Sequence, residues 1–273
     1  MSASNVHEEL CKQQMDTSKE LFHWRVVAAS VRGTSHERVK QLCQDAHHWQ
    51  MLPEGVLVAA VADGAGSATL GKVGAIVAAQ TAVETICLKE AMPQLPSDDQ
   101  GWQSLLTNAL EAAKTAVEAE AVVCRMTPRD LATTLIIVVA TPDLIAAAQI
   151  GDGVAVAADP QGNLIALTAP QRGEYINETT FLVSPNALET AQVNLWRGAT
   201  TNIAVLSDGL QMLALEMTEN TPHTPFFSPL FRFVGEVTDA TEAKEQLVAF
   251  LRSERITKRT DDDLTLLLAT LVS

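Results

Sequence analysis

Positive charge is scarce in this sequence. Its 273 residues include 19 lysines and arginines against 33 aspartates and glutamates, which gives a formal net charge of -14 at pH 7. Nucleic acids and anionic membrane surfaces attract proteins mainly through lysine and arginine side chains. We therefore expect a protein that binds neither nucleic acid nor membrane.

Paired cysteines and an apolar leader are also missing. The four cysteines, at positions 11, 43, 87 and 124, lie far apart and form no Cys-x-x-Cys pair. This spacing argues against a structural zinc site and predicts reduced or buried thiols, which are typical of the cytoplasm. Residues 1–20 are polar and acidic, unlike a signal peptide, and no other run is long and apolar enough to span a bilayer. We expect a cytoplasmic monomer with a polar leader (1–20) and one domain (21–273).

The hydrophobic pattern predicts a layered α+β domain. No repeat or linker divides the chain, and short apolar runs occur together with long helical patterns in blocks, without strict β-α-β alternation. Expected loops cover 92–101 and 221–229, and the polar stretch 168–180 is a candidate substrate-facing insert. The expected helices are 72–89, 102–124 and 240–252, and the expected strands are 22–31, 55–61, 133–140, 144–150, 154–158, 164–167, 203–206 and 264–272.

Acidic residues stand at the ends of four of these strands. Asp-Gly follows three of them, at Asp63, Asp152 and Asp208, and the run 261–263, three consecutive aspartates, directly precedes the last strand. Carboxylates that converge from several segments can hold hard cations such as Mg²⁺ or Mn²⁺. Asp-Gly is also one of the commonest turn dipeptides. The residues alone therefore leave two alternatives open, an oxygen-ligand metal site and an acidic, loop-rich rim.

Read in order, six segments resemble the motifs of the metal-dependent protein phosphatases of type 2C. They extend over almost the whole chain and are GTSHERVKQLCQDA (33–46), VADGAGSATLGKVGA (61–75), LATTLIIVVA (131–140), QIGDGVAV (149–156), LSDGL (206–210) and DDDLTLLLA (261–269). The resemblance implies a four-layer α-β-β-α sandwich of two antiparallel sheets flanked by helices. It also implies hydrolysis of phosphoserine and phosphothreonine in phosphorylated protein substrates by water activated between two Mg²⁺ or Mn²⁺ ions.

The resemblance assigns metal-binding roles to acidic positions of this chain. Of the three final aspartates we favour the middle one, because the family's last motif has an acidic and then a polar residue before the strand. A weaker third ion would lie between the second and third Asp-Gly sites. No phosphoenzyme is needed, and none of the four cysteines lies in a phosphate-cradling loop. The implied metal-binding residues are Asp45, Asp63, Gly64 through its carbonyl, Asp152, Asp208 and Asp262.

The sequence departs from the family pattern at two functional positions. Many members have His after the second motif's Asp-Gly, as a proton donor, where this chain has Ala65. Many also have Arg five positions before the first motif's Asp, where this chain has Lys40, which offers a point charge instead of a bidentate fork. His36, Arg38 and Lys40 are therefore the candidate phosphate contacts or proton donors.

These departures leave alternative functions open. The first expectation is an active serine/threonine phosphatase, and the second is a catalytically weak regulatory or phosphoprotein-binding module. A structural domain with acidic turns is a third. The segment 171–179 falls where the family inserts its variable flap, and it can be read as a substrate-recognition element or as an ordinary polar loop.

Overall fold

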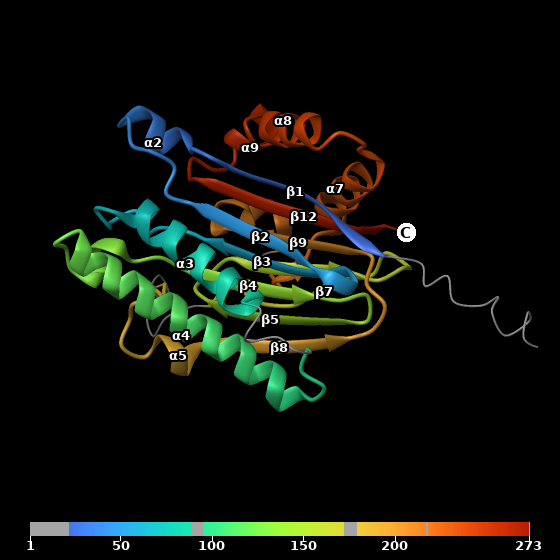
Figure 1. Cartoon of the computed structure of the whole chain (residues 1–273). Helices are drawn as coiled ribbons and strands as arrows, with labels where there is room; N and C mark the ends of the chain where they lie inside the picture. Colours follow the sequence, from blue (N-terminus) through green and yellow to red (C-terminus); the bar gives the residue numbers. More distant parts are fainter. Residues whose placement is uncertain (1–21, 89–94, 172–178, 217, 273) are drawn as a thin grey trace, which may run out of the picture.

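Two five-stranded antiparallel sheets form the centre of the protein (Figure 1). This computed structural model describes residues 22–88, 95–171, 179–216 and 218–272, so the leader predicted over 1–20 lies outside the described residues. The first sheet, of order β1-β12-β9-β6-β7, contains β1 (His23–Val31), β12 (Leu264–Val272), β9 (Asn202–Leu206), β6 (Val154–Ala158) and β7 (Leu164–Ala166). The second, of order β2-β3-β4-β5-β8, contains β2 (Ala46–Leu52), β3 (Val56–Ala62), β4 (Leu135–Ala140), β5 (Leu144–Ile150) and β8 (Gln192–Arg197).

Helices cover the outer face of each sheet. In Figure 1, α3 (Gly71–Cys87) and α4 (Asp99–Val123) lie on one side, and α7 (Thr224–Glu236) and α8 (Ala240–Leu251) lie on the other. None of the helices in the described ranges is long and apolar enough to cross a membrane. The shorter elements are α2 (Thr34–Arg38), η1 (Pro53–Gly55), η2 (Pro128–Leu131), α5 (Ala187–Thr190), η3 (Asp208–Leu210), α6 (Gln211–Ala214), β10 (Leu215–Glu216), β11 (Thr221–Pro222) and α9 (Glu254–Thr257).

The central strands are apolar on both faces because both faces are covered. On β3, Val58 and Ala60 pack in the core under α3 and α4, whereas Leu57 and Val61 pack between the two sheets. A third core lies between the first sheet and the helices α7 and α8. Alternate residues of one strand therefore serve different cores, which explains a continuous apolar run. The four-layer α-β-β-α sandwich of two antiparallel sheets is confirmed.

The prediction of a loop over 221–229 is wrong for most of that range. The segment contains three prolines, yet α7 begins at Thr224 and includes Pro229. Pro225 occupies the first turn, where the missing N–H costs nothing. The buried side chains of Phe227 and Phe231 stabilise the helix against the first sheet. An apolar face buried in the core therefore outweighs the cost of the interior proline.

The prediction also missed the two outer strands of the second sheet, β2 and β8. Each lies at an edge of that sheet and has partly or fully exposed residues along much of its length. Edge strands of this kind lack the continuous apolar run of a buried strand, and polar residues such as His47, His48 and Asn194 obscure the pattern. The remaining predicted strands and helices are present, with ends shifted by a few residues.

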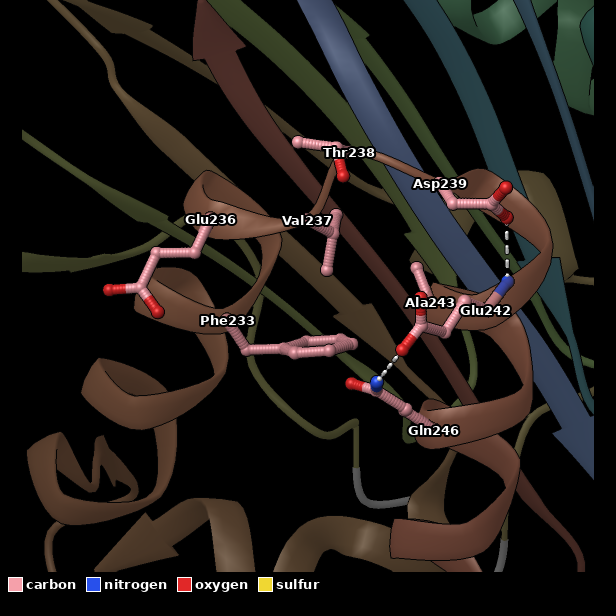
Figure 2. Close-up of a pocket in the computed structure, with 8 residues that line it drawn as sticks. All are labelled: Phe233, Glu236, Val237, Thr238, Asp239, Glu242, Ala243 and Gln246. Atoms are coloured by element: carbon pink, nitrogen blue, oxygen red, sulfur yellow. Dashed lines mark hydrogen bonds between the residues drawn. The ribbon is translucent and has the colours of Figure 1, made fainter.

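A surface cavity of about 280 Å³ lies between α7 and α8 (Figure 2). The ring of Phe233 and the side chain of Ala243 form apolar parts of its lining. Asp239 caps α8 by accepting hydrogen bonds from the backbone N–H groups of Thr241 and Glu242, at 2.7 and 2.9 Å. Asp239 therefore has a structural role as the cap of α8, and none of the predicted site residues lines this cavity.

Candidate active site

Strand pairing brings the predicted aspartates to one end of the sandwich. The end of β9 lies beside the starts of β12 and β6, because Leu206 pairs with Leu266 and with Val154. In the other sheet Ala46 pairs with Ala62, which places Asp45 beside Asp63. Antiparallel pairing thus brings aspartates that are distant in the sequence to the same edge of the sandwich.

A cavity of about 210 Å³ opens at this edge. Its lining comes from the ends of both sheets and is rich in carboxylates. Within the described ranges, no lysine or arginine contributes to it. The lining residues are His36, Asp63, Gly64, Ala65, Gly66, Thr134, Asp152, Thr179, Phe181, Asp208, Asp262 and Asp263.

The carboxyl group of Asp63 lies close to those of Asp45 and Asp208. Burial and these two acidic neighbours raise the pKa of Asp63 well above its ordinary value. Burial likewise raises the pKa of Asp45 to about 7, and burial with the charges of Asp152 and Asp262 raises that of Asp208 to about 6. Carboxylates can face each other in this way only when a proton or a cation neutralises them. The three groups therefore form a site that favours positive charge.

Unpartnered oxygens show that the cavity fits a divalent cation. The Oδ1 atoms of Asp45 and Asp208 are buried and have no hydrogen-bond partner among the described residues. Hard cations such as Mg²⁺ and Mn²⁺ bind such carboxylate oxygens. Across the described part of the chain, no three His, Cys, Asp or Glu side chains are already arranged as a complete shell. Cation binding there would require small rotations of the cavity carboxylates.

Hydrogen bonds hold the acidic residues in place. Ser207 Oγ donates to Asp45 Oδ2 at 2.7 Å and accepts from the backbone N–H of Thr265 at 2.9 Å. The N–H of Asp63 donates to Thr134 Oγ1 at 3.1 Å, and its carbonyl accepts from the Thr133 hydroxyl at 2.9 Å. The strand ends thus fix the backbone of Asp63 and the carboxyl group of Asp45.

Asp262 and Asp263 are neighbours with different surroundings. Asp263 is buried, and its carboxylate accepts hydrogen bonds from the N–H groups of Gly33 and Gln44, at 2.7 and 2.6 Å. It also lies 2.9 Å from His36 Nδ1. The Asp262 carboxyl group accepts only from the next backbone N–H, at 2.8 Å, and packing and Asp263 raise its pKa. This arrangement favours Asp262 over Asp263 as a metal-binding residue.

Asp152 also lines the cavity, close enough to Asp208 for its charge to raise the pKa of that carboxyl group. Its side chain accepts a hydrogen bond from Thr179 Oγ1 at 2.6 Å, and its carbonyl accepts from the side chain of Gln211 on α6. Thr179 follows the residues 172–178 of the predicted flap, which lie outside the described residues. The described end of that segment, Thr179, therefore lines the cavity beside Asp152.

The three candidate phosphate contacts are not equally placed. His36 lines the cavity, with Nδ1 held by Asp263. Arg38 is exposed and pairs with Asp261 at 2.6 Å, and Lys40 is exposed in a left-handed turn with φ of 58°. Neither basic residue contributes to the lining. The arrangement therefore does not support a phosphate-binding or proton-donating role for Arg38 or Lys40, and these roles stay predictions. It favours His36 for such a role.

Sequence reasoning did not single out Thr134, Ser207, Phe181 or Thr265. Ser207 and Thr134 do fall inside the quoted motifs, directly before Asp208 and within the segment 131–140. Their position beside the acidic residues was the available signal. Thr265 likewise falls inside the quoted segment 261–269, whereas Phe181 lies outside every quoted motif and its place in the lining arises only from the tertiary structure.

Cys43, which is close to Asp45 and Asp263, is a poor nucleophile. Burial, with the neighbouring charges of Asp45 and Asp263, raises the pKa of the Cys43 thiol. Only a thiolate attacks efficiently, so a raised pKa disfavours covalent catalysis. Cys87 and Cys124 are also free thiols, whereas Cys11 lies outside the described residues. This agrees with the expectation that no phosphoenzyme forms on cysteine.

A family model described as protein phosphatase 2C matches residues 32–252 of the chain. The chain belongs to the protein phosphatase 2C family. This membership confirms the resemblance seen in the ordered motifs, and it makes the protein an enzyme of a metal-dependent phosphatase family.

Relatives of this protein phosphatase 2C member agree with that assignment. Serine/threonine-protein phosphatase 3 of Escherichia coli (strain K12) is 36% identical over 252 residues, which cover 90% of this chain and 98% of the relative. The catalytic domain of the serine threonine protein phosphatase PstP, in complex with two manganese ions, has the same fold at 18% identity. Its TM-score is 0.61, with 92% of this chain and all of that chain covered. PppA of Pseudomonas aeruginosa matches at 20% identity and a TM-score of 0.60, covering 92% and 98%.

Proposed function

We propose that this protein phosphatase 2C member hydrolyses phosphoserine and phosphothreonine residues of proteins with the help of Mg²⁺ or Mn²⁺ ions. The observation that carries the proposal is the convergence of distant aspartates on one cavity, with the Asp63 carboxyl group against those of Asp45 and Asp208. The similarity to the Escherichia coli serine/threonine-protein phosphatase 3 supports the choice of serine and threonine. The two manganese ions of PstP support a two-ion site.

In this proposal the cavity carboxylates bind cations, and His36 contacts the substrate. When bound, the cations supply an activated water and neutralise the charge that develops on the phosphoryl oxygens. The carboxylates of Asp63, Asp208 and Asp262 would hold these ions, assisted by Asp45 and the carbonyl of Gly64. Asp152, with Asp208, would hold a weaker third ion.

His36 is the proposed phosphate contact or proton donor to the leaving alkoxide. Its Nδ1 is held by the Asp263 carboxylate at 2.9 Å, which fixes the orientation of the ring in the cavity lining. In this role His36 would serve in place of the histidine that many family members have at the position of Ala65.

The expected partner is a phosphorylated protein, and we propose a cytoplasmic monomer. The net charge of -14 disfavours nucleic acids and anionic membranes as partners. Reduced cysteines are typical of the cytoplasm.

Turnover of a phosphopeptide and of p-nitrophenyl phosphate, with and without Mn²⁺, tests the proposal. We expect Mn²⁺-dependent release of phosphate that stops with EDTA. Asp63→Asn should lower turnover by about 100-fold or more, since even the hydrogen-bond partners of metal ligands contribute about 10- to 100-fold. The matched control is Asp261→Asn, because Asp261 is exposed and paired with Arg38. Turnover that EDTA leaves undiminished would contradict the two-ion mechanism.

The alternative of a catalytically weak module rests on two observations. In the described lining of the cavity no lysine or arginine is present to orient the phosphate, and Ala65 stands where many family members have histidine. Saturable Mn²⁺ and phosphopeptide binding with negligible turnover would favour this alternative. Substantial turnover would exclude it.

A further inference from the structure

A second hollow, of about 570 Å³, lies directly beside the acidic cavity. We call it the side groove. Its described lining combines an apolar wall, which includes Phe181 and Val183, with one basic side chain, that of Arg129. Its charge therefore differs from that of the neighbouring cavity, where the described lining contains carboxylates and no lysine or arginine.

Three observations make the side groove continuous with the acidic cavity. Thr179 and Phe181 line both of them. Gly66 lines the cavity, and the next residue, Ser67, lines the groove. The backbone N–H of Ala65 in the cavity donates to the carbonyl of Ala132 in the groove at 2.9 Å. A peptide whose phosphorylated residue occupies the cavity can therefore continue into the groove.

The backbone of η2 holds Arg129 rigidly at this place. The carboxylate of the next residue, Asp130, accepts hydrogen bonds from the N–H and the hydroxyl of Thr127 at 2.9 and 2.6 Å. The Asp130 carbonyl accepts from the N–H of Leu70 at 2.8 Å, and Leu131 is fully buried. A rigid backbone lowers the entropic cost of presenting the Arg129 side chain to a ligand.

The guanidinium of Arg129 is available for a ligand. Among the described residues it makes no ion pair, and the adjacent Asp130 carboxylate is already bonded to Thr127. A second basic residue of the described ranges, Lys114, donates to the carbonyl of the groove residue Ser184 at 2.7 Å. A carboxylate is the natural partner of a free guanidinium, because the two planar groups match in charge and geometry.

We propose that the side groove binds the part of the phosphoprotein that flanks the phosphorylated residue, and that Arg129 selects substrates with an acidic side chain there. This inference rests on the proposed function and names the substrate class of that site. Each residue of an extended peptide spans about 3.3–3.6 Å, so the acidic residue lies within a few positions of the phosphoserine. A basic residue at that position would face the guanidinium and be disfavoured.

A set of phosphopeptides in which one glutamate moves through the positions around phosphoserine tests the proposal. For wild type we expect kcat/KM to be higher, through a lower KM, at one or two glutamate positions than for the all-alanine peptide. Arg129→Ala should lower that preference by about two- to fivefold, the usual range for an exposed ion pair. Arg129→Glu should reverse it in favour of lysine. The control Arg232→Glu changes the net charge equally from the exposed face of α7 and should keep the preference.

Fluorescence anisotropy of the labelled peptides gives the same comparison without turnover. Loss of the glutamate preference in Arg129→Glu, by kinetics or by binding, supports the proposal. The same preference in wild type and Arg129→Glu, or none in wild type, overturns it. Absence of Mn²⁺-dependent turnover in every variant would count against the proposed function, and the binding data would still decide the role of Arg129.

Discussion

At the scale of single residues, three consecutive aspartates occupy three different environments. Asp261 is exposed and pairs with Arg38. Asp262 faces the acidic cavity, and Asp263 is buried with its carboxylate hydrogen-bonded to two backbone N–H groups and beside His36. One acidic run therefore supplies a surface ion pair, a candidate metal ligand and the anchor of a candidate catalytic histidine.

Ser207 is a single residue whose loss should weaken metal binding. Its hydroxyl is the donor that holds the Asp45 carboxylate, at 2.7 Å. We expect Ser207→Ala to lower Mn²⁺ affinity by about 10- to 100-fold, as is usual when a partner of a metal ligand is removed. Turnover at saturating Mn²⁺ should change much less. A titration of activity against Mn²⁺ checks this, with the exposed Ser228→Ala as control, and an unchanged Mn²⁺ requirement would contradict it.

His47 should make stability depend on pH. Removal from water lowers the pKa of its imidazole to about 4, with Lys244 and His48 contributing, and its Nδ1 lies 2.9 Å from Ser30 Oγ. Between about pH 6.5 and 4 the unfolded chain binds this proton and the folded protein does not. The free energy of unfolding therefore falls as the pH drops through that window, by up to about 3 kcal/mol.

Urea unfolding of wild type and His47→Asn at several pH values measures this effect. Other titrating groups are common to both proteins, so the difference between the two curves isolates His47. We expect the variant to lose less stability than wild type on acidification, whereas His223→Asn, at an exposed position, should follow wild type. Parallel curves for wild type and His47→Asn would show that His47 is not held neutral.

At the scale of elements, α3 lies so close to η2 that only glycine fits at the contact. A Cβ atom added at Gly74 would lie 2.0 Å from the carbonyl oxygen of Leu131. We expect Gly74→Ala to lower the free energy of unfolding by about 1–3 kcal/mol, as overpacking usually does. Gly235→Ala is the matched control, because a Cβ atom there meets nothing within 4 Å, and the higher helix propensity of alanine should leave stability equal or slightly higher. Equal stability of the two variants, measured by urea unfolding, would contradict this packing.

The predictability of each element from sequence follows from its burial. The strands β3, β4 and β5 were predictable because both of their faces are covered, which requires a continuous apolar run. The edge strands β2 and β8 were not, because their polar residues interrupt that run. Helix α7 was not predicted because its prolines favour a loop. Burial of its aromatic face stabilises the helix despite that preference.

The acidic part of the candidate site was predictable for a related reason. Asp63, Asp152 and Asp208 each follow a recognisable strand, and antiparallel pairing must bring strand ends together. The contact of His36 with Asp263 and the exposure of Lys40 were not predictable. Both depend on how α2 and its adjoining loop pack beside β12, and no local pattern in the sequence records that packing.

At the scale of the whole molecule, the protein concentrates negative charge at one end of a well-packed sandwich. The facing carboxylates of Asp45, Asp63 and Asp208 are unfavourable for folding unless protons or cations neutralise them. Cation binding should therefore couple to stability, since a ligand at 100 times its dissociation constant stabilises the folded state by about 2.7 kcal/mol per site. The central claim is that this end of the molecule is a divalent cation site.

Isothermal titration calorimetry of Mn²⁺ into the metal-free protein tests that claim most directly. The account predicts saturable binding of about two ions by wild type and by Asp261→Asn, and the loss of at least one ion in Asp208→Asn. Circular dichroism of each variant checks that it remains folded. Wild-type protein that is folded and takes up no stoichiometric Mn²⁺, or Asp208→Asn that binds as wild type does, would contradict the account.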